Sequence, residues 1–207
     1  MVADMQTSLP STAEIWTWLD AVSDPEIPVL SVVDLGIVRS VRWVEAEPEA
    51  DLTATPPSSP SSDSTLVVTI TPTYSGCPAT AVIKAEIIRA MQQRGVNRVR
   101  LETQLSPAWT TDWMSERGKM RLLEYGIAPP EAQGHGCTAP VGALKLGLAP
   151  VLHSFSDGGS EARTMGIPCP RCGSADTRLV SRFGSTPCKA FYICNSCLEP
   201  FDHFKCH

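Results

Sequence analysis

The sequence predicts an α+β protein: a small two-layer domain (helix-strand-strand-helix-strand) followed by a C-terminal zinc ribbon. Helix-like and strand-like hydrophobic patterns alternate in that order over residues 11–127, and two Cys-x-x-Cys pairs follow near the C-terminus. The length of 207 residues also exceeds one domain of ordinary size. We therefore expect an α+β domain over 11–127, a connector over 128–165 and a zinc ribbon over 166–207.

The first helix begins with a capping pattern. Residues 11–14 (Ser-Thr-Ala-Glu) have the Ser-x-x-Glu form of a capping box, which predicts a helix over 12–22. The turn-forming segment 24–28 (Asp-Pro-Glu-Ile-Pro) follows it. Residues 36–44 and 65–71 are rich in Val and Ile, so we expect the first two strands there.

The second half of the domain repeats this alternation. Apolar residues recur at helical spacing between Pro78, which suits a helix start, and Gly95, which suits a helix end. A third strand is predicted over 96–103, and a further helix over 112–125. One sheet covered by two helices is the expected arrangement.

Two segments are predicted to lack stable structure. Residues 45–64 are crowded with Pro, Ser, Thr, Glu and Asp, so we expect a disordered insertion between the first two strands. Residues 128–165 are rich in Gly, Ala and Pro, which is typical of a flexible connector.

The charge balance limits the range of partners. Seventeen basic and 22 acidic residues give a formal net charge of -5, which argues against a general nucleic-acid or anionic-membrane binder. The N-terminus has no signal-peptide pattern, and no stretch approaches about 20 apolar residues. We expect a cytoplasmic protein with no nucleic-acid and no membrane partner; homodimerisation stays open.

Two Cys-x-x-Cys pairs separated by 21 residues are the most specific signal in the sequence, and they consist of Cys169, Cys172, Cys194 and Cys197. This spacing is typical of structural sites that hold Zn²⁺ between four thiolates. An iron centre and a redox dithiol have compatible spacing and stay open. Cys188 and Cys206 lie nearby, so either is an alternative ligand.

A fifth candidate thiol lies in the first domain. Cys77 is predicted at the N-cap of the helix that follows it, where free amides and the helix dipole stabilise a thiolate. A buried packing role is the alternative. Asp24, Glu26 and Asp34 cluster in the loop after the first helix, where either turn chemistry or a ligand site explains them.

Motifs of self-sufficient catalysts are missing from the sequence. No Glu lies three residues before any of the four histidines, so the Glu-x-x-His motif of di-iron carboxylate proteins is absent. The sequence also has no Gly-x-Gly-x-x-Gly, Walker A, His-Glu-x-x-His or Gly-x-Ser-x-Gly motif. We therefore expect a protein that is not an enzyme.

Five segments together resemble the PaaD family (also called PaaJ) of the bacterial phenylacetyl-CoA epoxidase system, and the resemblance runs nearly end to end. These segments are residues 24–28 (Asp-Pro-Glu-Ile-Pro), 34–36 (Asp-Leu-Gly), 71–78 (Thr-Pro-Thr-Tyr-Ser-Gly-Cys-Pro), 182–186 (Arg-Phe-Gly-Ser-Thr) and 201–206 (Phe-Asp-His-Phe-Lys-Cys). The first domain also resembles the SufT-type domains that assist iron–sulfur assembly. That resemblance rests on residues 24–26 and Cys77.

These resemblances imply an accessory factor that matures the epoxidase, with its oxygenase and reductase subunits as partners. They imply that Cys77, Asp24 and Glu26 transfer iron or an iron–sulfur cluster, more readily to the reductase, and that the ribbon recognises the recipient. The alternative is a structural or regulatory zinc-binding subunit with no transfer role. A nucleic-acid-binding ribbon is a third reading, supported only by local basic residues, which are Arg171, Arg178, Arg182 and Lys189.

Overall fold

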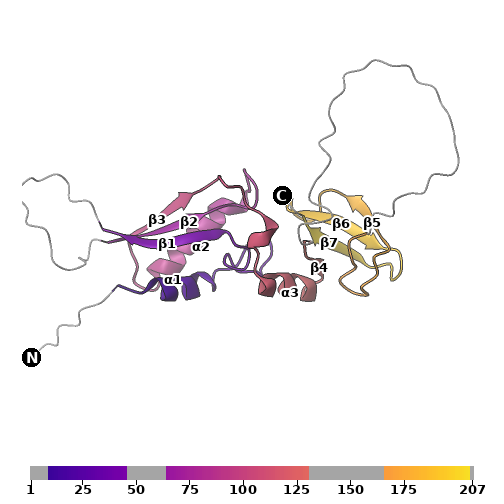
Figure 1. The fold of residues 1–207 in the computed structure, drawn as a ribbon, viewed down its shortest axis with the longest axis horizontal. Coiled ribbons are helices and arrows are strands. Elements are labelled where there is room, and N and C mark those ends of the chain that lie inside the picture. Colours follow the sequence, from indigo (N-terminus) through magenta and orange to yellow (C-terminus); the bar gives the residue numbers. More distant parts are fainter. Residues whose placement is uncertain (1–8, 46–63, 131–165, 206–207) are drawn as a thin grey trace, which may run out of the picture.

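The computed structural model describes residues 9–45, 64–130 and 166–205 (Figure 1). The predicted insertion at 45–64 and the predicted connector at 128–165 therefore lie almost wholly outside the described residues. Within the described residues, no helix has the length and apolar character needed to cross a membrane.

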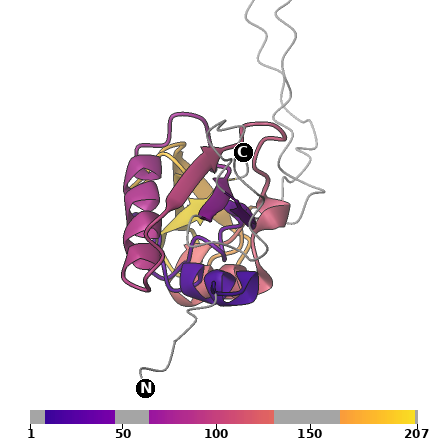
Figure 2. The same ribbon diagram turned by 90° about the vertical axis from the view of Figure 1, so that its left-hand side faces the viewer.

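The first five elements follow the predicted order, which confirms the α+β class. They are α1 (Thr12–Leu19), β1 (Val38–Val44), β2 (Thr65–Ile70), α2 (Ala79–Gln92) and β3 (Val99–Thr103). The strands form one sheet in the order β1-β2-β3, in which β1 runs antiparallel and β3 parallel to the central strand β2. The parallel pair requires a crossover, which α2 provides (Figure 2).

The predicted capping box starts α1. The Ser11 amide donates to Glu14 Oε2 at 2.8 Å, and the Glu14 amide donates to Ser11 Oγ at 3.3 Å. The helix ends at Leu19, three residues before the predicted end, because Asp20 caps it and the chain turns there. Asp20 Oδ1 then accepts a hydrogen bond from Ser31 Oγ, which holds the following loop close to the helix end.

The core lies between the sheet and the two helices. Ile15 and Leu19 of α1, four residues apart, are fully buried, as are Ile83 and Ile87 of α2 to within a few per cent. They pack with the central strand, of which Val68 is fully buried. Residues at this spacing share one helix face, so the sequence pattern places both apolar faces on the sheet.

The predicted helix over 112–125 is divided in the structure. A short 3-10 helix η1 (Thr111–Trp113) is followed by α3 (Glu116–Glu124). Ser115 between them has extended backbone geometry, and its Oγ accepts from the Gly118 amide at 2.9 Å. The prediction of one continuous helix was wrong because Ser115 caps a new helix at this point.

The ribbon is a sheet of four strands in the order β4-β7-β6-β5. Its strands are β4 (Ile127–Ala128), β5 (Thr177–Ser181), β6 (Lys189–Cys194) and β7 (Pro200–Phe204). Because β4 follows α3 and pairs in parallel with β7, the two predicted units share a sheet. The predicted domain boundaries stay a prediction.

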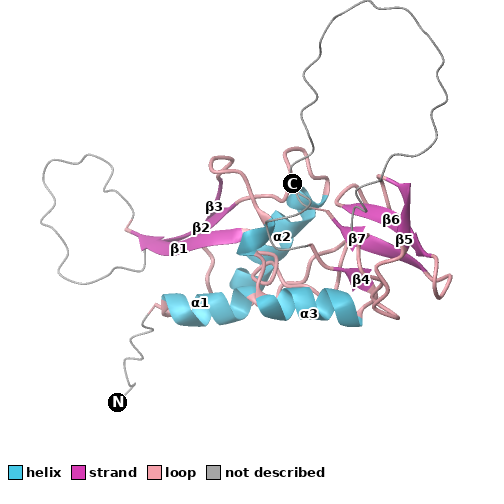
Figure 3. Cartoon of the chain, turned by 45° about the vertical axis from the view of Figure 1, so that its right-hand side comes forward, coloured by secondary structure: helices cyan, strands magenta, loops and turns pink. Residues whose placement is uncertain are grey.

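The junction between the ribbon and the first domain is a packed core. Phe204 at the end of β7 is 1% exposed and meets Trp109 edge-on, with ring centroids 6.1 Å apart. Cys188 and Ile127 belong to the same buried cluster. Figure 3 shows α1 and α3 in succession along one side of the molecule, with β4 and the ribbon beyond α3.

Candidate metal centre and thiol pocket

The ribbon brings four thiols together. The Sγ atoms of Cys169, Cys172, Cys194 and Cys197 all lie within 4.8 Å of one another. Cys169 and Cys194 are buried, whereas Cys172 and Cys197 are exposed, so the group lies at the surface with two of its residues covered by the ribbon. The sequence spacing predicted this grouping of thiols.

The sulfur positions fit a tetrahedral metal site. A tetrahedron with metal–sulfur bonds of about 2.3 Å has edges of about 3.8 Å. The Cys169 and Cys197 sulfurs are 3.7 Å apart, and those of Cys172 and Cys194 are 3.6 Å apart. Both separations are far from the roughly 2 Å of a disulfide. These four residues would therefore hold Zn²⁺, which supplies the cross-link that folds a small ribbon.

Each Cys-x-x-Cys pair forms a tight turn that aims both sulfurs at one point. The Cys197 amide donates to Cys194 Sγ at 3.5 Å, and this hydrogen bond is the largest of several contacts that lower the pKa of the Cys194 thiol. The residue after each pair has left-handed geometry, namely Gly173 with φ 74° and Leu198 with φ 62°. Glycine suits that geometry, and leucine does not.

The two alternative ligands have separate outcomes. Cys206 lies outside the described residues. Cys188 is not in the four-thiol group but in a pocket of the first domain, where its Sγ lies 3.6 Å from Glu26 Oε2. The sequence did not predict this position, because only the folded chain brings β6 to the loop after α1.

Cys77 lines that same pocket. It is half-buried and precedes the N-cap of α2, which is Pro78, so the prediction that Cys77 itself is the N-cap was off by one residue. Asp24, Glu26, Cys77 and Cys188 line the pocket together with apolar core side chains. The predicted transfer residues and a second thiol therefore share one cavity.

Asp24 shapes the loop that presents Glu26 to the pocket. Its Oδ1 accepts from the amides of Glu26 at 2.8 Å and Ile27 at 2.7 Å. Burial raises the pKa of the Asp24 carboxyl, although these two amide hydrogen bonds oppose the rise. The geometry supports turn chemistry for Asp24, and a ligand role for it stays a prediction.

Tyr74 interacts with the Cys77 thiol. Burial raises the pKa of the Tyr74 phenol well above the usual value, and a hydrogen bond with the Cys77 thiol is the next cause. The charges of Cys77, Glu26 and Cys188 act in the same direction. Burial likewise raises the pKa of the Cys188 thiol to about 11, which keeps it protonated near neutral pH.

The family of the chain follows from its similarity to known proteins. Residues 156–205 match the family model described as the PaaD zinc beta ribbon domain. The chain is 44% identical over 197 residues to an Escherichia coli (strain K12) protein provisionally named as the D component of 1,2-phenylacetyl-CoA epoxidase. That alignment covers 95% of this chain and 94% of the relative. The chain belongs to the PaaD family.

Solved structures resemble a part of this PaaD chain more distantly. A DUF59 domain of unknown function from Bacillus anthracis is 25% identical, covering 53% of this chain and 89% of that one, with a TM-score of 0.41. A Mycobacterium tuberculosis protein associated with Fe-S complex assembly and repair is 26% identical, covering 59% and 94%, with a TM-score of 0.31. Both scores are low, so the family assignment rests on the sequence match.

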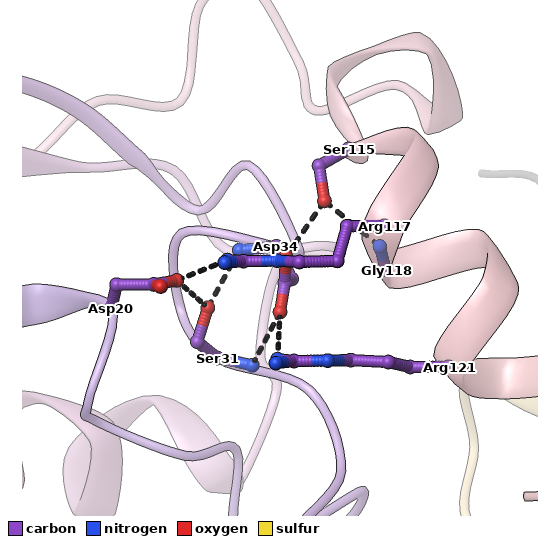
Figure 4. Close-up of polar contacts among 7 residues, drawn as sticks. All are labelled: Asp20, Ser31, Asp34, Ser115, Arg117, Gly118 and Arg121. Carbon is purple, nitrogen blue, oxygen red and sulfur yellow. Dashed lines mark hydrogen bonds and ion pairs between the residues drawn. The ribbon is translucent and has the colours of Figure 1, made fainter.

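The third acidic residue of the loop, Asp34, has a structural role in this PaaD chain (Figure 4). Its carboxylate is fully buried and accepts from Arg117 Nε at 2.8 Å, Arg121 at 2.7 Å and Ser115 Oγ at 2.7 Å. Burial alone would raise the pKa of Asp34, but the hydrogen bonds from Ser115 and Arg117 outweigh it and lower that pKa. Asp34 thus anchors α3, which leads directly to β4.

The neighbouring Leu35 and Gly36 complete this anchor. Trp109 Nε1 donates to the Leu35 carbonyl at 2.8 Å. Gly36 has φ 65°, and a Cβ there would lie 2.2 Å from the Trp113 carbonyl oxygen. Only glycine fits both constraints, so the Asp-Leu-Gly segment is explained by the fold rather than by ligand binding.

Two of the local basic residues of the PaaD ribbon lie against carboxylates. Lys189 is 5% exposed, and its ammonium lies 3.5 Å from Asp202 Oδ2. Arg171 pairs with Glu199 at 3.2 Å. Two of the four basic residues that supported the nucleic-acid reading are therefore balanced by carboxylates.

Proposed function

We propose that this chain is a non-catalytic maturation factor of aerobic phenylacetate degradation. It assists iron or iron–sulfur cluster assembly in the multicomponent phenylacetyl-CoA epoxidase, with the reductase component as the preferred recipient. Membership of the PaaD family supports the choice of system. The resemblance of residues 24–26 and Cys77 to SufT-type domains supports the choice of task.

The observation that carries the proposal is the thiol pocket. Cys77 is half-buried and lines one cavity together with Glu26, and the other walls of this cavity are mostly apolar. Thiolate and carboxylate together suit Fe²⁺, and an apolar wall slows the entry of water. The half-exposed position leaves Cys77 accessible to a partner protein, which transfer requires.

The ribbon has a supporting task in this proposal. Zn²⁺ bound to the four clustered thiols folds the ribbon, because so short a segment has few large apolar side chains to bury. The folded ribbon then offers a surface that recognises the oxygenase or reductase subunits. No catalytic residue is assigned to either domain.

Cys77→Ala in a strain that co-expresses the reductase tests the proposal. We expect the variant to fold and retain its zinc, while the iron and acid-labile sulfide content of the purified reductase falls severalfold. Val82→Ala is the matched control, because Val82 is an exposed residue of α2 that does not line the thiol pocket.

Full cluster occupancy in the reductase beside Cys77→Ala would overturn the transfer role. The chain would then be a structural or regulatory zinc-binding subunit of the epoxidase. In that case Cys169→Ala, which removes a ribbon ligand, would lower the amount of assembled complex, and Cys77→Ala would not.

A further inference from the structure

The pocket holds two thiols from distant parts of the chain. Cys77 comes from the loop before α2, and Cys188 directly precedes β6 of the ribbon. Both line one cavity together with Glu26. Because β4 and Phe204 fix the ribbon against the first domain, this pairing is a built feature of the fold.

The surroundings of Cys188 differ from those of a cysteine that only fills core space. It is 5% exposed, yet its Sγ lies 3.0 Å from Thr186 Oγ1 and 3.6 Å from Glu26 Oε2. A packing cysteine needs no polar partner. Here the sulfur has two polar partners, and one of them is a carboxylate from the first domain.

The size of the cavity restricts the ligand. Its volume is about 20 Å³, which accommodates one water-sized group. A single metal ion fits this space, whereas an iron–sulfur cluster does not fit unless the ribbon moves away. The second thiol therefore points to ion binding rather than to cluster binding in the docked state.

We propose that Cys77 and Cys188 form a composite two-thiolate site for one thiophilic divalent cation, Fe²⁺ as cargo, which exists only when the ribbon is docked. This inference rests on the proposed function, since it names the cargo of the same pocket. It also gives the ribbon a chemical part in ion binding, because the ribbon supplies one of the two thiolates.

Ion binding at this site releases protons. Each thiol loses one proton as its sulfur–metal bond forms. The bound cation displaces both protons, which leave to solvent. Cys188 Sγ donates to Glu26 Oε2, and Glu26 also lines a second, open pocket, which gives the Cys188 proton a route out. No electron is transferred in this step.

The composite site differs from the ribbon site in being incomplete. Among the described residues, the ribbon cysteines are the one group with three or more ligand atoms within 4.8 Å of one another. The pocket thus offers two thiolates and leaves coordination positions for water or for a ligand of the recipient. Weak, open coordination suits an ion that must leave again.

Anaerobic titration of the zinc-loaded full chain with Co²⁺ tests the inference, because thiolate–Co²⁺ charge-transfer bands report the number of sulfur ligands. We expect the wild type to bind one Co²⁺ per chain without releasing zinc. Cys77→Ser and Cys188→Ser should each weaken that binding by at least about tenfold and reduce the charge-transfer absorbance per bound ion. Val82→Ala should bind as the wild type does.

Each other result is decisive. The composite site is overturned if the wild type binds no Co²⁺ beyond what replaces its zinc. Co²⁺ binding that depends on Cys77 but not on Cys188 also overturns it, and in that case the maturation role still stands on the reductase assay. If the reductase assay fails while both thiols bind Co²⁺, the proposed function fails and the site remains.

A second measurement covers the case in which Cys188→Ser releases zinc or unfolds. The X-ray absorption spectrum of the wild-type, zinc-loaded chain with one equivalent of Co²⁺ is recorded at the cobalt edge, where the sulfur ligands of Co²⁺ are counted apart from those of zinc. We expect two sulfur ligands per cobalt ion. A single sulfur ligand, or none, overturns the composite site.

Discussion

The ribbon thiols and the pocket thiols are built in opposite ways. The four ribbon cysteines lie in two short turns, and their sulfurs already have the spacing of a closed tetrahedral site. Cys77 and Cys188 lie 111 positions apart in the chain and line one pocket only because the ribbon packs against the first domain. The first arrangement retains a metal ion, and the second suits an ion that comes and goes.

This contrast explains why one protein carries two thiol sites. A closed four-thiolate site holds zinc too tightly to act as a donor, so its role is to fold the ribbon. Once folded, the ribbon can place Cys188 beside Glu26. In the proposed scheme, the metal held by the ribbon therefore builds one wall of the pocket that binds and releases the cargo ion.

The largest expected effect comes from removing a zinc ligand of the ribbon. Cys169→Ala removes one buried ligand of the four, and structural zinc contributes roughly 10 kcal/mol or more of apparent binding free energy. We expect loss of zinc and of the ribbon fold, measured by elemental analysis and by the amide signals of β5 to β7. Cys188 should become reactive toward iodoacetamide at the same time.

Cys188→Ala is the control for this prediction. It leaves all four clustered thiols in place, so zinc content should stay at one per chain. Retention of zinc by Cys169→Ala, or loss of zinc in Cys188→Ala, would contradict the ligand set.

The same contrast shows what the sequence could predict. The spacing of two Cys-x-x-Cys pairs is local information, so the four-thiol group followed from it. The position of Cys188 depends on the pairing of β4 with β7 and on the burial of Phe204, and neither is encoded by a local motif. A cysteine left over after the zinc ligands are counted was the only signal.

The three acidic residues of the loop after α1 have different roles in the structure, which residue type alone could not predict. Asp24, Glu26 and Asp34 are equivalent candidates in the sequence, yet only Glu26 directs its carboxylate at a thiol. Asp24 holds its own turn, and Asp34 is buried against two arginines of α3. Their partners are up to 87 residues away, beyond the reach of pattern analysis.

An intermediate effect is expected at Asp34, which holds α3 between the first domain and the ribbon. Asp34→Ala removes a fully buried carboxylate from Arg117, Arg121 and Ser115, which releases the start of α3. We expect the free energy of unfolding to fall by about 3 kcal/mol, because several charge-assisted hydrogen bonds are lost. Denaturant unfolding measures it, and Cys188 alkylation should become faster as α3 and β4 loosen.

Two observations check this prediction. Glu116→Ala breaks an exposed ion pair with Lys119 on the same helix and should change stability by less than about 0.5 kcal/mol. The second observation is the pH dependence of stability. The hydrogen bonds to Asp34 lower its pKa in the folded state, so the contribution of Asp34 to the free energy of unfolding is complete above the unfolded pKa of about 3.9. This contribution is lost as pH falls toward the lower folded pKa. Equal losses in both variants would rule out a special role for Asp34.

The smallest effect is expected at the two residues with left-handed geometry that follow the Cys-x-x-Cys turns of the ribbon site. Leu198 has φ 62° and is 75% exposed, so it bears left-handed strain without compensating burial. Leu198→Gly should raise the free energy of unfolding by about 1 kcal/mol at a fixed free zinc concentration. Gly173→Ala, where the added Cβ meets nothing within 4 Å, should lower it by a similar amount. If Leu198→Gly stabilises the chain and Gly173→Ala destabilises it, the zinc site forms in the wild type despite the backbone strain at Leu198. Destabilisation by Leu198→Gly would instead show that the leucine side chain makes a stabilising contact.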